Sequence, residues 1–160
     1  MVVDESVTTG RMFHALSRGS RPHDWITNLG GALGYGQPLA IGSAIACPDR
    51  KVLLLQGDGA GMYMPQSLWT IAREALDVLV LVFANRSYAV LRRDMELRRQ
   101  DTAAPAARSL LDIGRPEIDW VALAGSLGVP ASRVATMEDF NKVVDVGLRT
   151  PGPALVHVDL

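Results

Sequence analysis

Two uninterrupted apolar runs set out the centre of the predicted fold. They span residues 52–55 and 78–84, and both are rich in Val and Leu. Strands that are apolar at every position are buried on both faces of a sheet, whereas strands with one face in water alternate apolar and polar residues. We therefore expect both runs to be central strands. Shorter strands are expected at residues 2–3, 133–135 and 154–158.

Helices are expected between these strands. Pro38 and Pro65 each suit the first turn of a helix, so helices are predicted over about 38–46 and 65–75. Others are predicted over about 88–99, 120–127 and 137–148, and Thr8 or Thr9 is expected to cap a helix that runs to about Leu16. Residues 100–115 have weak periodicity and predict a loop or a short helix. The alternation predicts an α/β layered fold with a mainly parallel sheet flanked by helices.

Composition narrows the class of protein. The 160 residues fit one compact domain, and 48% hydrophobic with 21% charged residues is ordinary for a globular fold. A formal net charge of −1 predicts neither nucleic acid nor a membrane surface as a partner. The longest apolar runs are too short to cross a bilayer, and acidic residues stand where the basic start of a signal peptide would lie, so a cytoplasmic location is expected.

Polar clusters follow the two central strands. Gly57-Asp58-Gly59 comes after the first strand and Asn85-Arg86-Ser87 after the second. Ligands bind at the carboxyl ends of strands in parallel sheets. If the two strands are neighbours, Asp58 and Asn85 project into one crevice.

Carboxylate and amide oxygens are hard ligands that suit Mg²⁺, which often binds phosphates at the same time. Glycines at 57 and 59 let the backbone approach a bulky anion, so a magnesium-bridged diphosphate is the natural occupant. The segment lacks the lysine of a P-loop, and Met62 stands where a dinucleotide-binding motif requires glycine or alanine. Taken alone, however, the tripeptide at 57–59 could be a simple turn.

The wider pattern resembles the thiamine diphosphate enzymes. Their motif opens with Gly-Asp-Gly and closes with Asn after a gap like the 85 − 58 = 27 positions between Asp58 and Asn85. The segments 53–60, 82–88 and 30–38 and the opening residues 3–6 are also similar to that family. The resemblance covers nearly the whole chain and is closest to the acetolactate synthase, benzoylformate decarboxylase and pyruvate decarboxylase group.

The resemblance implies a magnesium site made of three residues. Asp58 and Asn85 would bind the ion through side-chain oxygens and Ser87 through its backbone carbonyl. The family often has serine where Ala60 stands and a second asparagine where Ala84 stands. The spacing still indicates Asn85 as the ligand.

The same resemblance implies a set of cofactor-binding residues. Gly59 and Ala60 would donate backbone N–H groups to the diphosphate, and Thr8 would contact the diphosphate from the first loop. Gly31 would accept a hydrogen bond from the aminopyrimidine through its carbonyl, and Leu33 would support the bent cofactor. Gly57 and Tyr88 complete the expected set. Tyr63 and Leu91 could either face the substrate or pack in the core.

The resemblance also implies that the site is incomplete. The glutamate that activates the cofactor belongs to a pyrimidine-binding domain, often of a partner subunit, and Glu5 stands in the wrong place for it. We therefore expect residues 1–160 to be a C-terminal diphosphate- and magnesium-binding domain without catalytic residues of its own, acting in a homo- or hetero-oligomer, in the simplest case a dimer. The expected reaction is decarboxylation or carboligation of a 2-oxo acid. The alternative is a non-catalytic remnant that associates with a full-length relative.

Overall fold

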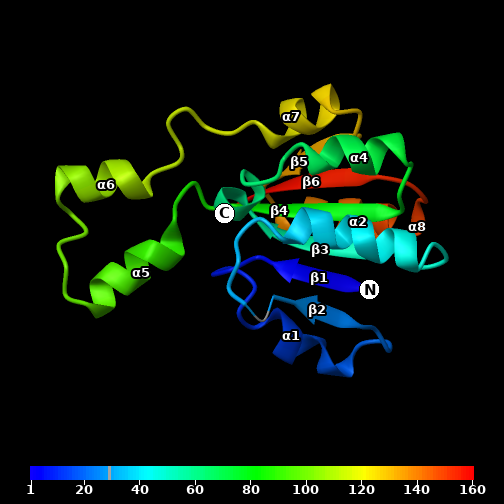
Figure 1. The fold of residues 1–160 in the computed structure, drawn as a ribbon, viewed down its shortest axis with the longest axis horizontal. Coiled ribbons are helices and arrows are strands. Elements are labelled where there is room, and N and C mark those ends of the chain that lie inside the picture. Colours follow the sequence, from blue (N-terminus) through cyan, green and yellow to red (C-terminus); the bar gives the residue numbers. More distant parts are fainter. Residues whose placement is uncertain (29) are drawn as a thin grey trace.

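The computed structural model describes residues 1–28 and 30–160, and these form a six-stranded sheet (Figure 1). Its strands lie in the order β2-β1-β3-β4-β6-β5, and every neighbouring pair is parallel. The strands are β1 (Val2–Glu5), β2 (Trp25–Thr27), β3 (Val52–Gly57), β4 (Val78–Ala84), β5 (Ala131–Val134) and β6 (Ala154–Asp159). The predicted α/β fold with a parallel sheet is confirmed.

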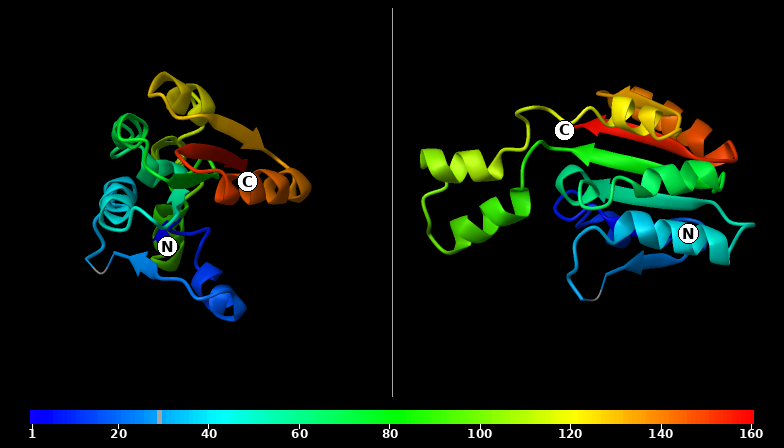
Figure 2. Two further views of the ribbon diagram at one scale, coloured as in Figure 1. Left: turned by 90° about the vertical axis from the view of Figure 1, so that its right-hand side faces the viewer. Right: turned by 45° about the horizontal axis from the view of Figure 1, so that its top comes forward.

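Helices cover both faces of this sheet (Figure 2). One face carries α2 (Gly36–Ala46), α4 (Ser67–Arg73) and α7 (Trp120–Ser126), and the other carries α1 (Phe13–Leu16) and α8 (Met137–Arg149). A 3-10 turn, η1 (Ser17–Gly19), follows α1, and α3 (Asp58–Gly61) is a single turn directly after β3. None of the described helices has the length and apolar character needed to cross a membrane.

The central strands are buried on both faces because each contributes to two separate cores. Leu54 and Val80 pack with α2, α4 and α7, whereas Leu55 and Leu81 pack with α1 and α8. Successive side chains of a strand point to opposite faces, so an uninterrupted apolar run supplies both cores at once. The apolar runs at 52–55 and 78–84 are therefore the two central strands, as predicted.

Two helices stand away from the sheet as an arm beyond its carboxyl edge (Figures 1 and 2). They are α5 (Ala89–Leu97) and α6 (Pro105–Leu111), and Leu111 is the one buried residue of the pair. An isolated antiparallel bridge between Ser87 and Asp112 closes the base of the arm. The stretch 100–115, predicted as loop or short helix, contains α6.

The amino-terminal third departs from the prediction in two places. The helix predicted from Thr8 or Thr9 begins only at Phe13, its N-cap is Met12, and no side chain caps it. β2 was not predicted at all, because three residues at the edge of a sheet show no readable periodicity. β2 pairs with β1 and turns the chain back toward the glycine-rich segment.

His157 is a buried polar residue in the middle of β6. Its side chain is fully buried, and neither ring nitrogen has a hydrogen-bond partner among the described residues. Burial lowers the pKa of this imidazole below its usual value, and the charge of Arg133 lowers it further. Folding therefore favours the neutral form of His157 relative to the unfolded chain.

Acidification below about pH 6.5 should therefore destabilise the fold, by up to about 1.4 kcal/mol per pH unit until the lowered pKa is reached. Over that range the unfolded chain binds a proton that the folded chain excludes. Urea unfolding between pH 7 and pH 5 measures this, and His157→Leu should flatten the dependence. His14→Leu, at an exposed position, is the control. If the free energy of unfolding depended on pH equally in His157→Leu and in the unaltered chain, His157 would not be the group responsible.

Candidate functional site

Adjacent strands bring the two polar clusters together. β3 pairs with β4, with Gly57 opposite Phe83, so Asp58 and Asn85 follow neighbouring strand ends at one edge of the sheet. Both residues line the same cavity, whose volume is about 240 Å³. The predicted crevice between these two strand ends is present.

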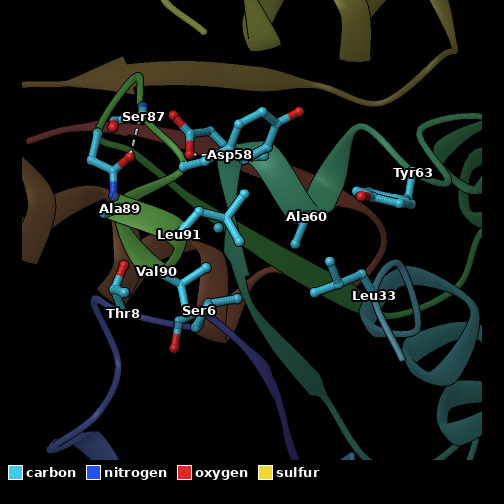
Figure 3. A pocket seen from close by; sticks show the side chains of 15 residues that line it. Ser6, Thr8, Leu33, Asp58, Ala60, Tyr63, Ser87, Ala89, Val90 and Leu91 are labelled. Atoms are coloured by element: carbon cyan, nitrogen blue, oxygen red, sulfur yellow. Dashed lines mark hydrogen bonds between the residues drawn. The ribbon is translucent and has the colours of Figure 1, made fainter. Parts of the chain in front are cut away.

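The cavity collects most of the residues expected to bind the cofactor (Figure 3). Figure 3 shows Asp58 and Ser87 at one end, and Leu33 and Tyr63 at the other. The complete lining is Ser6, Val7, Thr8, Leu33, Gly57, Asp58, Gly59, Ala60, Tyr63, Asn85, Ser87, Tyr88, Ala89, Val90 and Leu91. Nine of the ten residues predicted for cofactor or metal binding are in this set, and Gly31 is the exception.

Backbone groups fix the Asp58 carboxylate in place. The side chain is only 5% exposed, its Oδ1 accepts a hydrogen bond from Gly59 N–H at 2.9 Å, and its Oδ2 accepts one from Arg86 N–H at 2.7 Å. Burial raises the pKa of the Asp58 carboxyl above its usual value, while the Arg86 and Gly59 N–H groups oppose that rise. Among the described residues, no cationic side chain forms an ion pair with Asp58. The site is therefore suited to a bound cation.

The turn after β4 lines the same cavity as Asp58. Asn85 Oδ1 accepts a hydrogen bond from Ser87 N–H at 2.9 Å, which holds the amide over its own turn. The Ser87 carbonyl accepts from Ala89 N–H at 2.8 Å, which leaves its second lone pair for another partner. Hydrogen bonds from Tyr88 N–H to the Leu111 carbonyl and from Ile113 N–H to the Arg86 carbonyl fix the turn against the base of the arm.

Gly59 lies under the ring of Tyr88. A Cβ at position 59 would come within 2.7 Å of Tyr88 Cε1, which is closer than such atoms approach in proteins. The N–H of Gly59 already donates to Asp58, so in this structure it holds the carboxylate rather than pointing freely into the cavity. Gly59 therefore shapes the cavity through its lack of a side chain.

A second hollow, of about 220 Å³, adjoins the first. Gly31 lines it together with Asn28, Thr27 and Tyr35, while Leu33 and Val7 line both hollows. The Leu33 side chain is 51% exposed, so it stands between the two hollows rather than in a core. Gly31 and Leu33 thus belong to one continuous surface, although Gly31 lies outside the cavity that holds Asp58.

Glu5 organises the glycine-rich segment, a role that the sequence did not reveal. This buried carboxylate accepts hydrogen bonds from Gly34 N–H at 2.6 Å, from Gly36 N–H at 2.7 Å and from Gln56 Nε2 at 3.1 Å. Gly34 has a φ of +83°, and a Cβ there would meet Tyr63 Cβ at 2.5 Å. Glu5 thereby joins the ends of β1 and β3 to the start of α2. Its distance of 29 and 31 residues from these glycines hid the contact.

Tyr63 and Leu91 both line the main cavity. The sequence left two roles possible for them, contact with the substrate or packing in the core. Both side chains are exposed in this chain, so neither has a core role. Thr8 lies on the opposite wall with Ser6, on the turn that follows β1. Arg86 was missed by the sequence reasoning, although it stands between two predicted metal ligands.

Comparison with known proteins identifies the family of this chain. A family model described as "Thiamine pyrophosphate enzyme, C-terminal TPP binding domain" matches residues 7–158. The chain belongs to this family.

Relatives within the family are much longer than this chain. A protein of Mycobacterium tuberculosis named "Putative acetolactate synthase large subunit IlvX" is 45% identical over 99% of this chain, which spans 31% of that protein. The large subunit of acetolactate synthase isozyme 1 of Escherichia coli is 31% identical over 87% of this chain, which spans 24% of its length. The chain therefore spans less than a third of these curated relatives.

Solved structures share the fold. The thiamine diphosphate-dependent 4-hydroxybenzoylformate decarboxylase of Rhodococcus jostii RHA1 is 33% identical, with a TM-score of 0.76 over 84% of this chain and 24% of that one. Benzoylformate decarboxylase from Polynucleobacter necessarius has a TM-score of 0.81 over 99% of this chain and 29% of that one. The latter is only 24% identical and supports the fold alone.

Gly59→Ala should destabilise this thiamine pyrophosphate-binding domain by about 1–3 kcal/mol, because the new methyl group forces the Tyr88 ring aside. Urea unfolding measures the change. In the background of Tyr88→Ala the cost should fall markedly.

Gly125→Ala is the matched control, since a Cβ at that helical position meets nothing within 4 Å. It should stabilise the protein by up to about 1 kcal/mol. Equal costs for Gly59→Ala with and without the Tyr88 ring would show that the ring is not the obstacle.

Proposed function

We propose that this chain binds the diphosphate of thiamine diphosphate through Mg²⁺, as one half of a 2-oxo acid decarboxylase or an acetolactate synthase-like carboligase. The metal would be held by Asp58, by Asn85 and by the backbone carbonyl of Ser87. The observation that carries the proposal is the buried Asp58 carboxylate, which shares a cavity with Asn85 and has no cationic partner among the described residues. The donors are all oxygens, which is the set that Mg²⁺ prefers.

The two hollows suit the two ends of the cofactor. The diphosphate would lie in the cavity near Asp58, with Thr8, Gly57, Gly59, Ala60 and Tyr88 around it. The aminopyrimidine would enter the second hollow beside Gly31, with Leu33 between the two ends. Because Gly59 N–H donates to Asp58, its role toward the diphosphate is to allow close approach rather than to donate freely.

When bound, thiamine diphosphate supplies an electron sink for breaking or forming the bond next to a 2-oxo acid carbonyl. The chain's own residues orient the cofactor and exclude water from one side. Leu33, Val90 and Leu91 give the cavity an apolar wall beyond the polar end. Decarboxylation and carboligation are both represented among the names of the relatives, so we propose the shared 2-oxo acid chemistry.

The activating glutamate would come from a pyrimidine-binding domain or subunit. Both carboxylate oxygens of Glu5 are engaged by backbone N–H groups of the glycine segment, which fits a structural role. We therefore propose that the working enzyme is an oligomer in which a second polypeptide or domain completes the site.

Asp58→Ala should abolish magnesium-dependent binding of thiamine diphosphate in the assembled enzyme, because the one buried carboxylate of the metal site is lost. Titration calorimetry with and without Mg²⁺ measures the binding. Asp94→Ala is the control, since Asp94 lies in an exposed ion pair with Arg98 on α5. Unchanged binding in Asp58→Ala would show that the metal assignment is wrong. Failure of the unaltered assembly to bind at all would favour the non-catalytic role.

Leu33→Ala should leave the free energy of unfolding within about 0.5 kcal/mol, because half of this side chain is already exposed. It should nevertheless lower turnover and cofactor affinity in the assembled enzyme, since the bulk between the two hollows is removed. Leu148→Ala on α8 removes a side chain of similar exposure away from the cavity and is the control. Equal turnover in the two variants would refute a supporting role for Leu33.

A further inference from the structure

Arg86 occupies the central position of the proposed metal-binding turn. It stands between Asn85 and Ser87, and its φ of +55° lies in the left-handed region that residues with a side chain rarely adopt. In this conformation its N–H donates to Asp58 Oδ2 at 2.7 Å. The backbone of Arg86 therefore sets the positions of oxygens on both sides of the proposed metal site.

The side chain of Arg86 anchors this backbone through ion pairs. Its guanidinium pairs with Asp159 at the end of β6 and with Glu117 at 3.1 Å, in the segment before α7. Asp159 lies opposite Ala84 in the β4–β6 ladder, so the side chain folds back over the end of β4. Arg86 and Asp159 are largely shielded, at 33% and 19% exposure of their side chains, so this pair is less screened than a surface ion pair.

Arg133 completes a four-membered network. It pairs with Asp159 at 2.6 Å and with Glu117 at 2.9 Å, so two arginines balance two carboxylates. The arginines Arg133 and Arg86 hold the pKa of Asp159 at about 2, well below its usual value. The network thus ties the ends of β4, β5 and β6 together.

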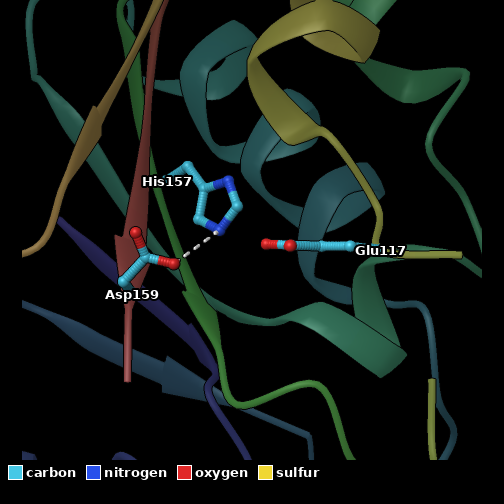
Figure 4. A group of neighbouring side chains, drawn as sticks. All are labelled: Glu117, His157 and Asp159. Atoms are coloured by element: carbon cyan, nitrogen blue, oxygen red, sulfur yellow. Dashed lines mark ion pairs between the residues drawn. The ribbon is translucent and has the colours of Figure 1, made fainter. Parts of the chain in front are cut away.

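Glu117, His157 and Asp159 gather closely enough to suggest a second metal centre, with ligand atoms within 4.8 Å of one another (Figure 4). Figure 4 shows the imidazole of His157 beside the two carboxylates. Both carboxylates, however, already accept from Arg86 and Arg133. The arginines occupy the place that a cation would take, so the cluster is an ion-pair network.

We propose that Arg86 is a positioning residue for the metal-binding turn, acting through its ion pairs with Asp159 and Glu117. The network stabilises the left-handed backbone at position 86, and this backbone directs an N–H to Asp58 and places the Asn85 and Ser87 oxygens. The metal-related part of this inference rests on the proposed function, whereas the control of the turn does not. Removing a group that orients a metal ligand typically weakens metal affinity ten- to a hundredfold.

Hydrogen exchange of backbone amides, measured by NMR on the full chain without metal, tests the control of the turn. Arg86→Ala and Asp159→Asn should each accelerate exchange at positions 86 and 87 by roughly tenfold or more, with the β3–β4 ladder unchanged. Arg86→Lys, which keeps one cationic contact, should give an intermediate rate. Arg98→Ala, which breaks the exposed pair with Asp94, should change nothing at the turn. Unchanged exchange at 86 and 87, or an equal acceleration throughout the sheet, would overturn the proposal.

Titration with Mn²⁺ and inorganic diphosphate, followed by water proton relaxation, tests the link to the metal. Arg86→Ala should bind Mn²⁺ roughly ten- to a hundredfold more weakly than the unaltered chain, with Arg86→Lys between them. Equal affinities would refute the positioning role toward the metal. If Asp58→Ala binds as well as the unaltered chain, or if neither binds even in the assembled enzyme, the proposed function fails, and the exchange rates alone decide whether Arg86 controls the turn.

Discussion

One hydrogen bond joins the two halves of the candidate metal site: the N–H of Arg86 donates to the carboxylate of Asp58. It connects the end of β3 to the turn that follows β4, two segments 28 residues apart. Parallel strands allow this because their carboxyl ends meet at the same edge, but adjacency alone does not fix side-chain directions. A charge-assisted hydrogen bond to a buried carboxylate does fix the direction of the Asp58 side chain. If Asp58 turned away, its buried charge would lose the Arg86 N–H that stabilises it.

A second buried carboxylate plays the corresponding part on the other side of the site. Glu5 accepts hydrogen bonds from the glycine segment, just as Asp58 accepts one from the turn after β4. Gln56 on β3 donates a further hydrogen bond to Glu5. The two carboxylates sit at the ends of β1 and β3, which are paired. Each hollow is thus bordered by an acid at a strand end that accepts hydrogen bonds from a distant loop, two for Glu5 and one for Asp58. Leu33 stands where the two constructions meet.

The sequence predicted the parts of this arrangement that depend on local pattern. The run at 78–84 coincides with β4 because continuous apolar residues leave little choice in a two-faced sheet. β2 escaped because three edge residues carry no period, and the helix start near Thr8 was wrong because the chain makes turns there before Phe13. That Asp58, Asn85 and Ser87 line one cavity could be anticipated from their spacing and from the family resemblance. The partners of Glu5 and Arg86 could not, because long-range contacts of acids and arginines leave no periodic trace in one sequence.

The arm of α5 and α6 is closed at its base and free at its tip. The bridge between Ser87 and Asp112 and the hydrogen bond from Tyr88 N–H to the Leu111 carbonyl bring the two ends of the arm together beside the proposed metal-binding turn. The entropy cost of such a closed excursion rises only slowly, by about 0.6 kcal/mol for each doubling of its length. The chain between these helices can therefore become longer or shorter with little thermodynamic penalty, while the geometry at the base of the arm stays the same. The fold in this way separates a segment whose length can vary from the backbone contacts that close the base of the arm.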